Sequence, residues 1–456
     1  MKIFVSNNVR IESAPPKMIN ALKQALTLPN PVFTTLLRRV KLGYQSARCL
    51  YAVKKEFKYY EHDKTLNIFT CGRGTEMPIK KYLSDHPEIK TEWDSEFVDV
   101  DLKKPLVFNG TLRDYQVGVP EQILSAGSHG VIKLGTGYGK TLIACELIRK
   151  LNKTALIIVP RNSILAQFKE TLKDFYDYDP GIIQGRIWDI KDITVASVAT
   201  LKQRCCNDIK NKFSIVLVDE CHTTISDKGI KTVQSFCSSY LYGLSATPKR
   251  TDEQSKAIFF TFGPILIDRA LPQKNPVVQV VKTNIDIRVN INYADMIGSM
   301  ADNTDRNFLI YRLAIQELKD KRKILILTKR IEHYKNIAKF FDNTFKIFQM
   351  SSDVKSEERD ELLRGFRNNA IEFDVILGTF SLLSTGVDIK QLDTLIIAGD
   401  LKSSVLTQQS AGRILRLFEG KNSPKVIDLD DNLNGILKTQ AQARRRFYKE
   451  NNWEIV

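Results

Sequence analysis

A glycine-rich octapeptide at residues 134–141, Leu-Gly-Thr-Gly-Tyr-Gly-Lys-Thr, limits what this chain can fold into more than any other feature. It stands between an apolar run that ends at Ile132 and a segment with helical spacing at residues 141–150. Glycines let the backbone turn its N–H groups inward, and a helix N-terminus adds a positive dipole, so such a strand–loop–helix unit holds phosphate groups. The loop residues that we expect at the phosphates are Gly135, Thr136, Gly137, Tyr138 and Gly139.

Two polar residues complete the loop. Lys140 offers a mobile cation to the β- and γ-phosphates of a nucleoside triphosphate, and Thr141 offers a hydroxyl to Mg²⁺. The loop departs from the pattern G-x-x-x-x-G-K-T at its first position, which is Leu134. A glycine-rich turn that ends by chance in Lys-Thr would have the same sequence, so the interpretation needs a second motif.

That second motif is Val-Asp-Glu-Cys-His at residues 218–222. The apolar, β-branched run at residues 213–218 predicts a central strand of a parallel sheet, and such sheets bind ligands at their carboxyl edge. Asp219 would hold Mg²⁺, largely through water, and Glu220 would orient and deprotonate the attacking water. An exposed acidic pair is the simpler alternative, but both motifs in this order favour hydrolysis of ATP with Mg²⁺.

Composition restricts the partners. The chain has 456 residues and a net charge of +16, which favours a polyanion but neither separates DNA from RNA nor excludes an acidic membrane. Its seven cysteines include no C-x-x-C pair, so we expect reduced thiols rather than disulfides or a zinc site. No secretory signal is apparent, and no apolar run approaches the length of a membrane span. We therefore expect a soluble intracellular protein without a membrane partner.

Strand-like and helical segments alternate twice along the chain. The first series, at residues 105–270, and the second, at residues 271–435, each predict a doubly wound parallel sheet of the α/β class. A phosphate loop occurs in the first series alone, so the first domain is expected to bind ATP. The predicted strands lie at residues 130–133, 155–159, 193–197, 215–218 and 240–244, and then at 323–327, 345–349, 374–378, 394–398 and 425–429.

The two ends of the chain have other patterns. Residues 1–104 predict a small basic α+β domain that serves as a DNA-binding accessory and ends in an acidic, irregular linker at residues 85–101. The run Lys-Lys-Glu-Phe-Lys-Tyr-Tyr at residues 54–60 is either a nucleic-acid face or a half-buried edge strand. Residues 436–456 predict a basic helix, which would either extend a nucleic-acid track or present a solvated face.

About eight motifs spread over residues 108–430 together resemble those of superfamily 2 helicases and translocases. The resemblance implies two tandem RecA-like domains after the small N-terminal domain. Arg-Asp-Tyr-Gln at residues 113–116 resembles the adenine-sensing motif. We therefore expect Gln116 on the base and Arg113 at the nucleotide.

Further motifs imply the coupling residues and the second half of the site. The segment Leu-Ser-Ala-Thr-Pro resembles motif III, in which Ser245 and Thr247 would couple hydrolysis to movement. Residues 378–388 resemble motif V and residues 409–416 resemble motif VI. An arginine from a facing domain stabilises the charge of the transferring phosphoryl group only when the cleft closes, which ties hydrolysis to domain closure. The residues that these two motifs imply at the nucleotide are Gly386, Asp388, Gln409, Arg413 and Arg416.

Two segments of the first domain, residues 159–167 and 194–201, resemble strand-binding motifs of the same superfamily. Contacts to phosphates position a backbone without reading its bases, so we expect sequence-independent binding with a steep salt dependence. The contact residues expected from these segments and from motif V are Pro160, Arg161, Ser197 and Thr379.

Three classes of motor remain open. Asp-Glu-Cys-His, with Phe-Gly-Pro at residues 262–264 and Thr-Asp-Arg-Asn at residues 304–307, most resembles the phage-type UvsW branch of the superfamily. That resemblance implies a DNA helicase that unwinds or branch-migrates forked and junction DNA in replication, recombination or repair. It would work as a monomer on DNA in the cytosol of a bacterium or phage-infected host. An RNA helicase ranks second, because DEAD-box enzymes usually carry DEAD at this place. A translocase subunit that moves on duplex DNA without unwinding it is the third class.

Overall fold

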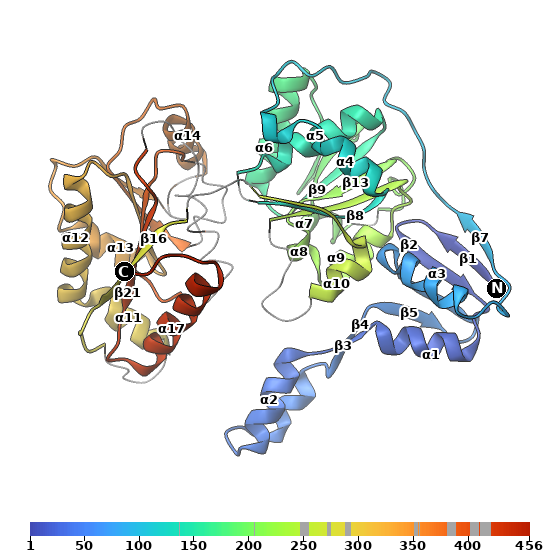
Figure 1. Ribbon diagram of the computed structural model, residues 1–456, viewed down its shortest axis with the longest axis horizontal. Coiled ribbons are helices and arrows are strands. Elements are labelled where there is room, and N and C mark those ends of the chain that lie inside the picture. The colour runs from blue at the N-terminus through green and yellow to red at the C-terminus, as the bar shows by residue number, and fades with distance from the viewer. Residues whose placement is uncertain are drawn as a thin grey trace. The chain divides into compact units, whose positions relative to one another are not determined.

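Apolar, β-branched runs form the strands of two mainly parallel sheets, one in each of the two units into which the chain divides, Met1–Leu271 and Pro272–Val456 (Figure 1). The computed structural model describes residues 1–135, 137–204, 206–246, 255–270, 275–287, 293–350, 354, 356–380, 389–401, 410 and 421–456. Within these ranges no helix is both long and apolar enough to cross a bilayer. The six cysteines found there are free thiols.

Eight strands form the main sheet of the first unit, in the order β11-β10-β12-β9-β13-β14-β8-β15. The five strands predicted from the sequence are β8, β9, β12, β13 and β14, and their pairings are all parallel. The strands are β8 (His129–Leu134), β9 (Ala155–Val159), β10 (Gly181–Gln184), β11 (Ile187–Trp188), β12 (Ile193–Ser197), β13 (Ile215–Val218), β14 (Tyr240–Ser245) and β15 (Ile265–Arg269).

Helices cover both faces of this sheet (Figure 1). Successive residues of a strand point to opposite faces, so Ile157 of β9 is buried in one core while Leu156 and Ile158 are buried in the other. This doubly wound arrangement confirms the predicted fold class. One face is covered by α4 (Val119–Ala126), α5 (Lys140–Leu151) and α6 (Asn162–Tyr176), and the other by α7 (Val198–Leu201), α8 (Cys221–Thr224), α9 (Asp227–Gln234) and α10 (Ser255–Phe262).

The N-terminal part of the first unit has its own five-stranded sheet, in the order β5-β6-β2-β1-β7, and a two-stranded ladder of β3 and β4. Helix α1 packs its buried face against the larger sheet. The elements are β1 (Lys2–Val5), β2 (Asn8–Glu12), α1 (Pro16–Ala25), β3 (Thr27–Pro29), α2 (Pro31–Lys41), β4 (Glu56–Lys58), β5 (Tyr60–Asp63), β6 (Ile68–Gly72), α3 (Glu76–Ser84) and β7 (Glu92–Ser95).

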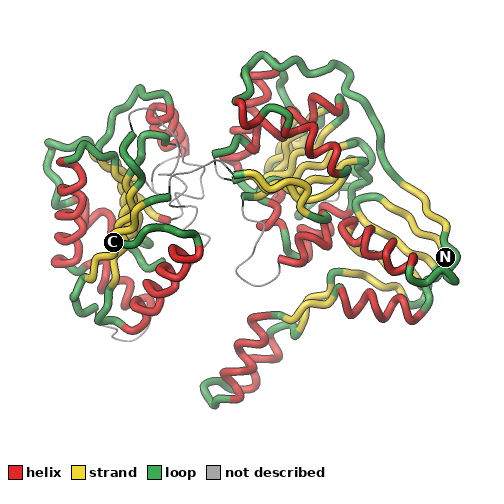
Figure 2. Tube along the Cα trace, in the orientation of Figure 1, coloured by secondary structure: helices red, strands yellow, loops and turns green. Residues whose placement is uncertain are grey.

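The expected irregular linker at residues 85–101 is wrong in part, because it contains β7, which pairs in parallel with β1. An edge strand tolerates charged side chains, and this one carries Glu92 and Asp94 on exposed positions, which hid it in the sequence. After β7 the chain runs as a long loop along the main domain (Figure 2), held by the bridges Val98↔Ser238 and Asp101↔Lys153.

A buried arginine fastens the N-terminal sheet to the main domain. Arg73 follows β6, is 2% exposed, and donates to the carbonyl oxygens of Ser238 and Ser239, both at 2.9 Å. The neighbouring backbone is close-packed, since a Cβ on Gly74 would lie 1.9 Å from the carbonyl oxygen of Phe259. The N-terminal part is therefore fixed on the first main sheet rather than tethered to it.

Six strands form the sheet of the second unit, in the order β16-β21-β20-β17-β19-β18, and every pairing is parallel. Helices α14 and α17 contribute to the core on one face, and α12 and α13 to the core on the other. The elements are β16 (Val277–Lys282), α11 (Tyr293–Asp302), α12 (Thr304–Lys319), β17 (Ile324–Thr328), α13 (Ile331–Ala338), β18 (Ile347–Met350), α14 (Ser356–Arg367), β19 (Val375–Thr379), β20 (Thr394–Ile397), β21 (Lys425–Asp430) and α17 (Gly435–Glu450).

The basic C-terminal helix α17 is not merely a solvated face. Arg444 is 4% exposed, pairs with Asp428 of β21, and donates to the carbonyl oxygens of Leu401 and Leu429 at 2.8 and 2.9 Å. Tyr448 is fully buried against the same sheet. A buried cation needs partners that only the folded sheet supplies, so the basic sequence alone could not separate this role from a nucleic-acid track.

Candidate active site

The glycine-rich loop joins the carboxyl end of β8 to the N-terminus of α5. Gly137 and Gly139 have φ angles of +83° and +93°, a left-handed conformation that side chains rarely adopt. Leu134, which replaces the first glycine of the pattern, is the last residue of β8 and is fully buried in the core. The departure therefore serves strand packing, and the loop still delivers Lys140 as the first residue of the helix. Thr136 lies outside the described residues.

Gln116 of the adenine-sensing motif is brought directly onto this loop. Its amide nitrogen donates to the carbonyl oxygen of Tyr138 at 2.8 Å, and its amide oxygen accepts from the backbone N–H of Arg113 at 3.0 Å. Tyr115, which the sequence did not single out, accepts a hydrogen bond from the Arg113 guanidinium at 2.6 Å and packs edge-on against the Tyr138 ring. Its place between Arg113 and Gln116 was the signal that could have found it.

Replacement of Gly139 by alanine is expected to lower ATP affinity by at least roughly tenfold, because two costs combine. A Cβ there would lie 2.3 Å from the Gln116 amide nitrogen, and the backbone is left-handed. Titration calorimetry with a non-hydrolysed ATP analogue measures the loss. Gly185→Ala is the control, because it has positive φ but open space around its Cβ, and it should leave ATP affinity unchanged. Equal affinity of the Gly139→Ala protein would contradict this account of the loop.

The acidic pair follows β13 at the same edge of the sheet. Asp219 is 6% exposed, and its Oδ1 has no hydrogen-bond partner among the described residues. Burial raises the pKa of Asp219 to about 6, against the opposing charge of Lys140. A buried carboxylate oxygen without a partner beside a phosphate loop fits a water-bound Mg²⁺, which would restore the charged form. Thr141 offers the second oxygen, and its hydroxyl accepts from the Gln167 amide at 3.1 Å.

Lys140 and Glu220 are already in contact. The Lys140 Nζ lies 2.6 Å from the Glu220 Oε1, and both side chains are largely shielded from solvent. Burial lowers the pKa of Lys140, but the charges of Glu220 and Asp219 outweigh burial and raise it. The lysine is therefore a cation whose charge Glu220 neutralises in this structure.

His222 connects the acidic pair to motif III. Its Nδ1 lies 3.0 Å from the hydroxyl oxygen of Ser245, the last residue of β14, and 3.4 Å from the Glu220 Oε2. Ser245 is fully buried, so a shift of either motif must disturb this contact. No role for His222 follows from the sequence alone. Thr247, the other predicted coupling residue, lies outside the described residues.

The predicted strand contacts lie along this same carboxyl edge. Pro160 and Arg161 follow β9, and Ser197 ends β12. Because β12, β9 and β13 are adjacent in the sheet, these residues lie at the same edge as Asp219, which follows β13. Burial lowers the pKa of Arg161, and the charge of the nearby Glu220 carboxylate opposes that shift only in part.

In the second unit, Thr379 ends β19 and is 6% exposed. It stands at the carboxyl edge of its own sheet, where the motif V segment begins. The remaining predicted residues of motifs V and VI lie outside the described residues: Gly386, Asp388, Gln409, Arg413 and Arg416.

Two family models match the chain over the segments that carry these motifs. The model described as "Type III restriction enzyme, res subunit" matches residues 109–250, and the "Helicase conserved C-terminal domain" matches residues 306–418. Strands β8 to β14 of the first main sheet and the Lys140–Glu220 site lie within the first match. The chain belongs to the superfamily 2 helicases and translocases.

Three relatives place the chain within that superfamily. The DNA 3'-5' translocase XPB2 of Sulfurisphaera tokodaii is 28% identical over 414 residues, which cover 81% of this chain and 91% of the relative. The putative ATP-dependent RNA helicase L396 of Acanthamoeba polyphaga mimivirus is 28% identical over 372 residues, 77% of this chain and 70% of the relative. The ATP-dependent DNA helicase uvsW of Enterobacteria phage T4 is 21% identical over 442 residues, 87% of each chain. The predicted relationship to UvsW is thereby confirmed.

A solved structure has the same fold. Mss116p (NTE and C-tail double deletion) bound to ssRNA and AMP-PNP has a TM-score of 0.56 at 15% identity, over 76% of this chain and 73% of that chain. At this level of identity the likeness supports the tandem RecA-like fold and nothing further.

Proposed function

We propose that this helicase uses ATP and Mg²⁺ to unwind or branch-migrate forked and junction DNA. The observation that carries the catalytic part is the convergence of Lys140, Asp219 and Glu220 at one carboxyl edge, with a Lys140–Glu220 distance of 2.6 Å. Residues from two loops about 80 positions apart meet there, as an in-line attack of water on a γ-phosphate requires.

Each residue has a distinct part in hydrolysis. Lys140 leaves Glu220 to neutralise charge on the β- and γ-phosphates, which frees the Glu220 carboxylate to accept a proton from the attacking water. Thr141 and Asp219 would hold Mg²⁺, whose charge stabilises the transferring phosphoryl group. We assign Arg413 and Arg416 of motif VI the role of stabilising the charge of the transferring phosphoryl group.

The contact between His222 and Ser245 supports a route from hydrolysis to movement. Loss of the γ-phosphate would change the position of Glu220, which lies 3.4 Å from His222. His222 transmits that change to Ser245, the motif III residue that ends β14. Release of phosphate is thereby coupled to the segments that hold the strand.

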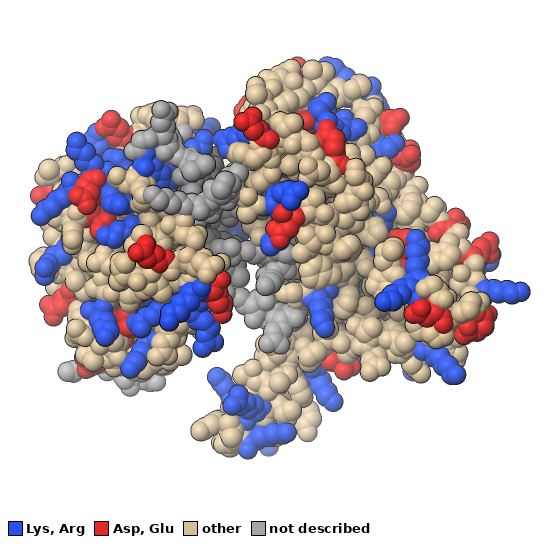
Figure 3. Space-filling model, in the orientation of Figure 1, with Lys and Arg blue, Asp and Glu red and all other residues tan. Residues whose placement is uncertain are grey.

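The N-terminal part supports a branched substrate, because a branch needs a second surface for its other arm. Helix α2 has no buried residue and carries Arg38, Arg39 and Lys41 in its last turn. Figure 3 shows Lys and Arg gathered on this projecting segment, whose residues 31–52 include no acid. We therefore retain residues 1–104 as a DNA-binding accessory module.

The alternatives have their own support. The relative L396 is a putative RNA helicase, which keeps RNA as the second candidate. XPB2 is a DNA translocase, and the first family model is that of a restriction subunit, so translocation along duplex DNA without unwinding is the third.

Steady-state ATP turnover on matched substrates tests the proposal. The purified chain is assayed with single-stranded DNA, plain duplex, a three-way fork, a four-way junction and an RNA duplex, with Lys140→Ala as the blank. We expect the fork and the four-way junction to stimulate turnover most. Strongest stimulation by RNA would exclude the DNA assignment, and an equal response to plain duplex would favour the translocase.

A further inference from the structure

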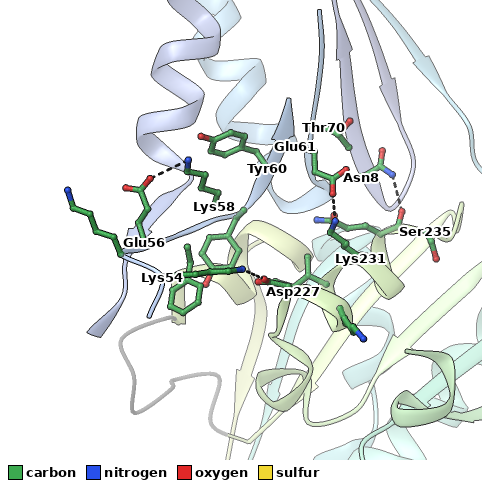
Figure 4. Close-up of a pocket in the computed structure, with 16 residues that line it drawn as sticks. Asn8, Lys54, Glu56, Lys58, Tyr60, Glu61, Thr70, Asp227, Lys231 and Ser235 are labelled. Atoms are coloured by element: carbon green, nitrogen blue, oxygen red, sulfur yellow. Dashed lines mark hydrogen bonds and ion pairs between the residues drawn. The ribbon is translucent and has the colours of Figure 1, made fainter. Parts of the chain in front are cut away.

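A groove of about 1060 Å³ runs between the N-terminal strands and helix α9 of the first unit (Figure 4). One wall is the run at residues 54–61, and the other is residues 227–235. Phe57 and Tyr59 of the first wall pack against the hydrophobic core, whereas Lys54, Lys55 and Lys58 of the same wall are exposed. Its charged lining residues are the cations Lys54, Lys55, Lys58, Lys228 and Lys231 and the acids Glu56, Glu61 and Asp227.

Two ion pairs cross the groove from wall to wall. The Lys54 Nζ lies 2.7 Å from the Asp227 Oδ2, and the Lys231 Nζ lies 2.5 Å from the Glu61 Oε1 (Figure 4). All four side chains are at least 60% exposed. Pairs so exposed contribute little to stability, so the oxygens of an incoming polyanion can replace the two carboxylates at small cost.

Further positive charge is already available. Lys55 and Lys228 are exposed, one on each wall, and neither has an ion-pair partner within the part of the chain that the structure describes. Among the described residues, the ion-pair partner of Lys58 is Glu56 of its own wall, at 3.5 Å. The lining therefore has five cations to three acids, an excess that favours an anionic occupant.

The second wall is fixed, before any ligand arrives, to the β1–β2 segment, which belongs to the same sheet as β5 at the end of the first wall. The Asn8 side chain donates to the carbonyl oxygen of Gln234 in α9 at 2.9 Å, and the buried Asn7 amide donates to Val233 at 3.1 Å. With Arg73 anchored nearby, the groove is preorganised, which lowers the entropic cost of binding.

One end of the groove meets the segment that resembles a strand-binding motif. Lys202 follows α7 and donates to the hydroxyl oxygen of Ser226 at 3.1 Å. Ser226 is the N-cap of α9, the helix that forms the second wall. A nucleic-acid backbone that leaves the strand-binding edge at Ser197 and α7 can thus continue along lysines of the groove.

We propose that this groove binds the phosphodiester backbone of a second DNA arm, with Lys55 and Lys228 as permanent contacts and Lys54 and Lys231 as contacts released from their acids. The inference rests on the proposed action on branched DNA and adds the site that holds the other arm. Contacts by lysine carry no base preference, so recognition is by backbone.

The first test removes the two unpaired cations. Binding of forked DNA by the full chain is measured by fluorescence anisotropy across a salt series. For Lys55→Gln/Lys228→Gln we expect the slope of log Kd against log salt to fall by about 2, roughly 1 for each lost phosphate contact. The control Lys173→Gln/Lys212→Gln removes two exposed lysines near the opposite, amino edge of the sheet and should keep the wild-type slope. An unchanged slope in the groove variant would overturn the proposal.

The second test predicts a change in DNA affinity in the opposite direction. Glu61→Gln/Asp227→Asn removes the acids that compete for Lys54 and Lys231, so we expect tighter binding of forked DNA and a steeper salt slope. If the ion pairs merely clamp the N-terminal part, the same variant binds forked DNA more weakly, and the proposal fails. Binding of poly-glutamate that depends on Lys55 and Lys228, with DNA affinity unaffected, would assign the groove to an acidic protein instead. Failure of the proposed function itself would be seen in a separate measurement, if no DNA substrate stimulated ATP turnover by the wild-type protein.

Discussion

Replacement of Glu220 by glutamine is expected to slow ATP turnover by about 10²- to 10⁴-fold, the contribution typical of a general base. Glutamine keeps the shape of the side chain, and Glu220 has a φ of +44°, which the amide tolerates as well as the acid. It removes the proton acceptor but leaves Lys140 and Thr141 in place. Single-turnover hydrolysis of radiolabelled ATP measures the loss.

The same variant should bind ATP at least as tightly as the wild type. In the free protein Glu220 holds the Lys140 ammonium at 2.6 Å, and phosphates must break that pair. Without the competing carboxylate, we expect affinity to rise, because the phosphates no longer have to displace it from the shielded ammonium. Glu121→Gln, at an exposed acid of α4 that pairs with Lys150 far along α5, is the control. Weakened ATP binding, or turnover near the wild-type rate, would refute the role assigned to Glu220.

Replacement of Lys140 by alanine is expected to abolish ATP turnover, a loss of at least about 10³-fold, for a different reason. The Lys140 ammonium is the cation that the sequence and the structure both place at the phosphate loop. The charges of Glu220 and Asp219 raise its pKa and so keep it protonated. Its loss also leaves two carboxylates facing the triphosphate without compensation. We therefore expect both weaker ATP binding and no measurable hydrolysis in the coupled turnover assay.

Lys150→Ala is the matched control for this experiment. Lys150 lies near the other end of α5 and pairs with Glu121 rather than with the site. The control should keep the wild-type turnover, which separates the loss of a specific cation from any general effect on the helix. Turnover by Lys140→Ala at a tenth of the wild-type rate or more would show that another group carries the phosphate charge.

The chemistry of the site could be predicted because it depends on short stretches of sequence. Glycines and Lys140 belong to one loop, and Asp219 and Glu220 follow one apolar run, so each half has a local signature. The contact between the phosphate loop and the acidic pair depends on the tertiary structure. The same holds for the Asp219 oxygen that has no partner among the described residues and for the contact between His222 and Ser245. Local patterns cannot specify them, because they arise where separate strands of one sheet end together.

The sequence by itself determined most of the parallel strands of both sheets and the phosphate loop, because buried strands need unbroken apolar runs and phosphate needs glycine and lysine. The parallel strands β10, β15 and β16 came only from the structure. Only the tertiary structure decided that residues 92–95 join β1 as an edge strand, and that Arg444 is buried rather than free for nucleic acid. From the sequence alone, a charged side chain on a solvated helix cannot be distinguished from one in a buried ion pair or in the wall of a groove. What separates them is the position of partners distant in the chain, such as Asp227 opposite Lys54, and the fold alone sets that position.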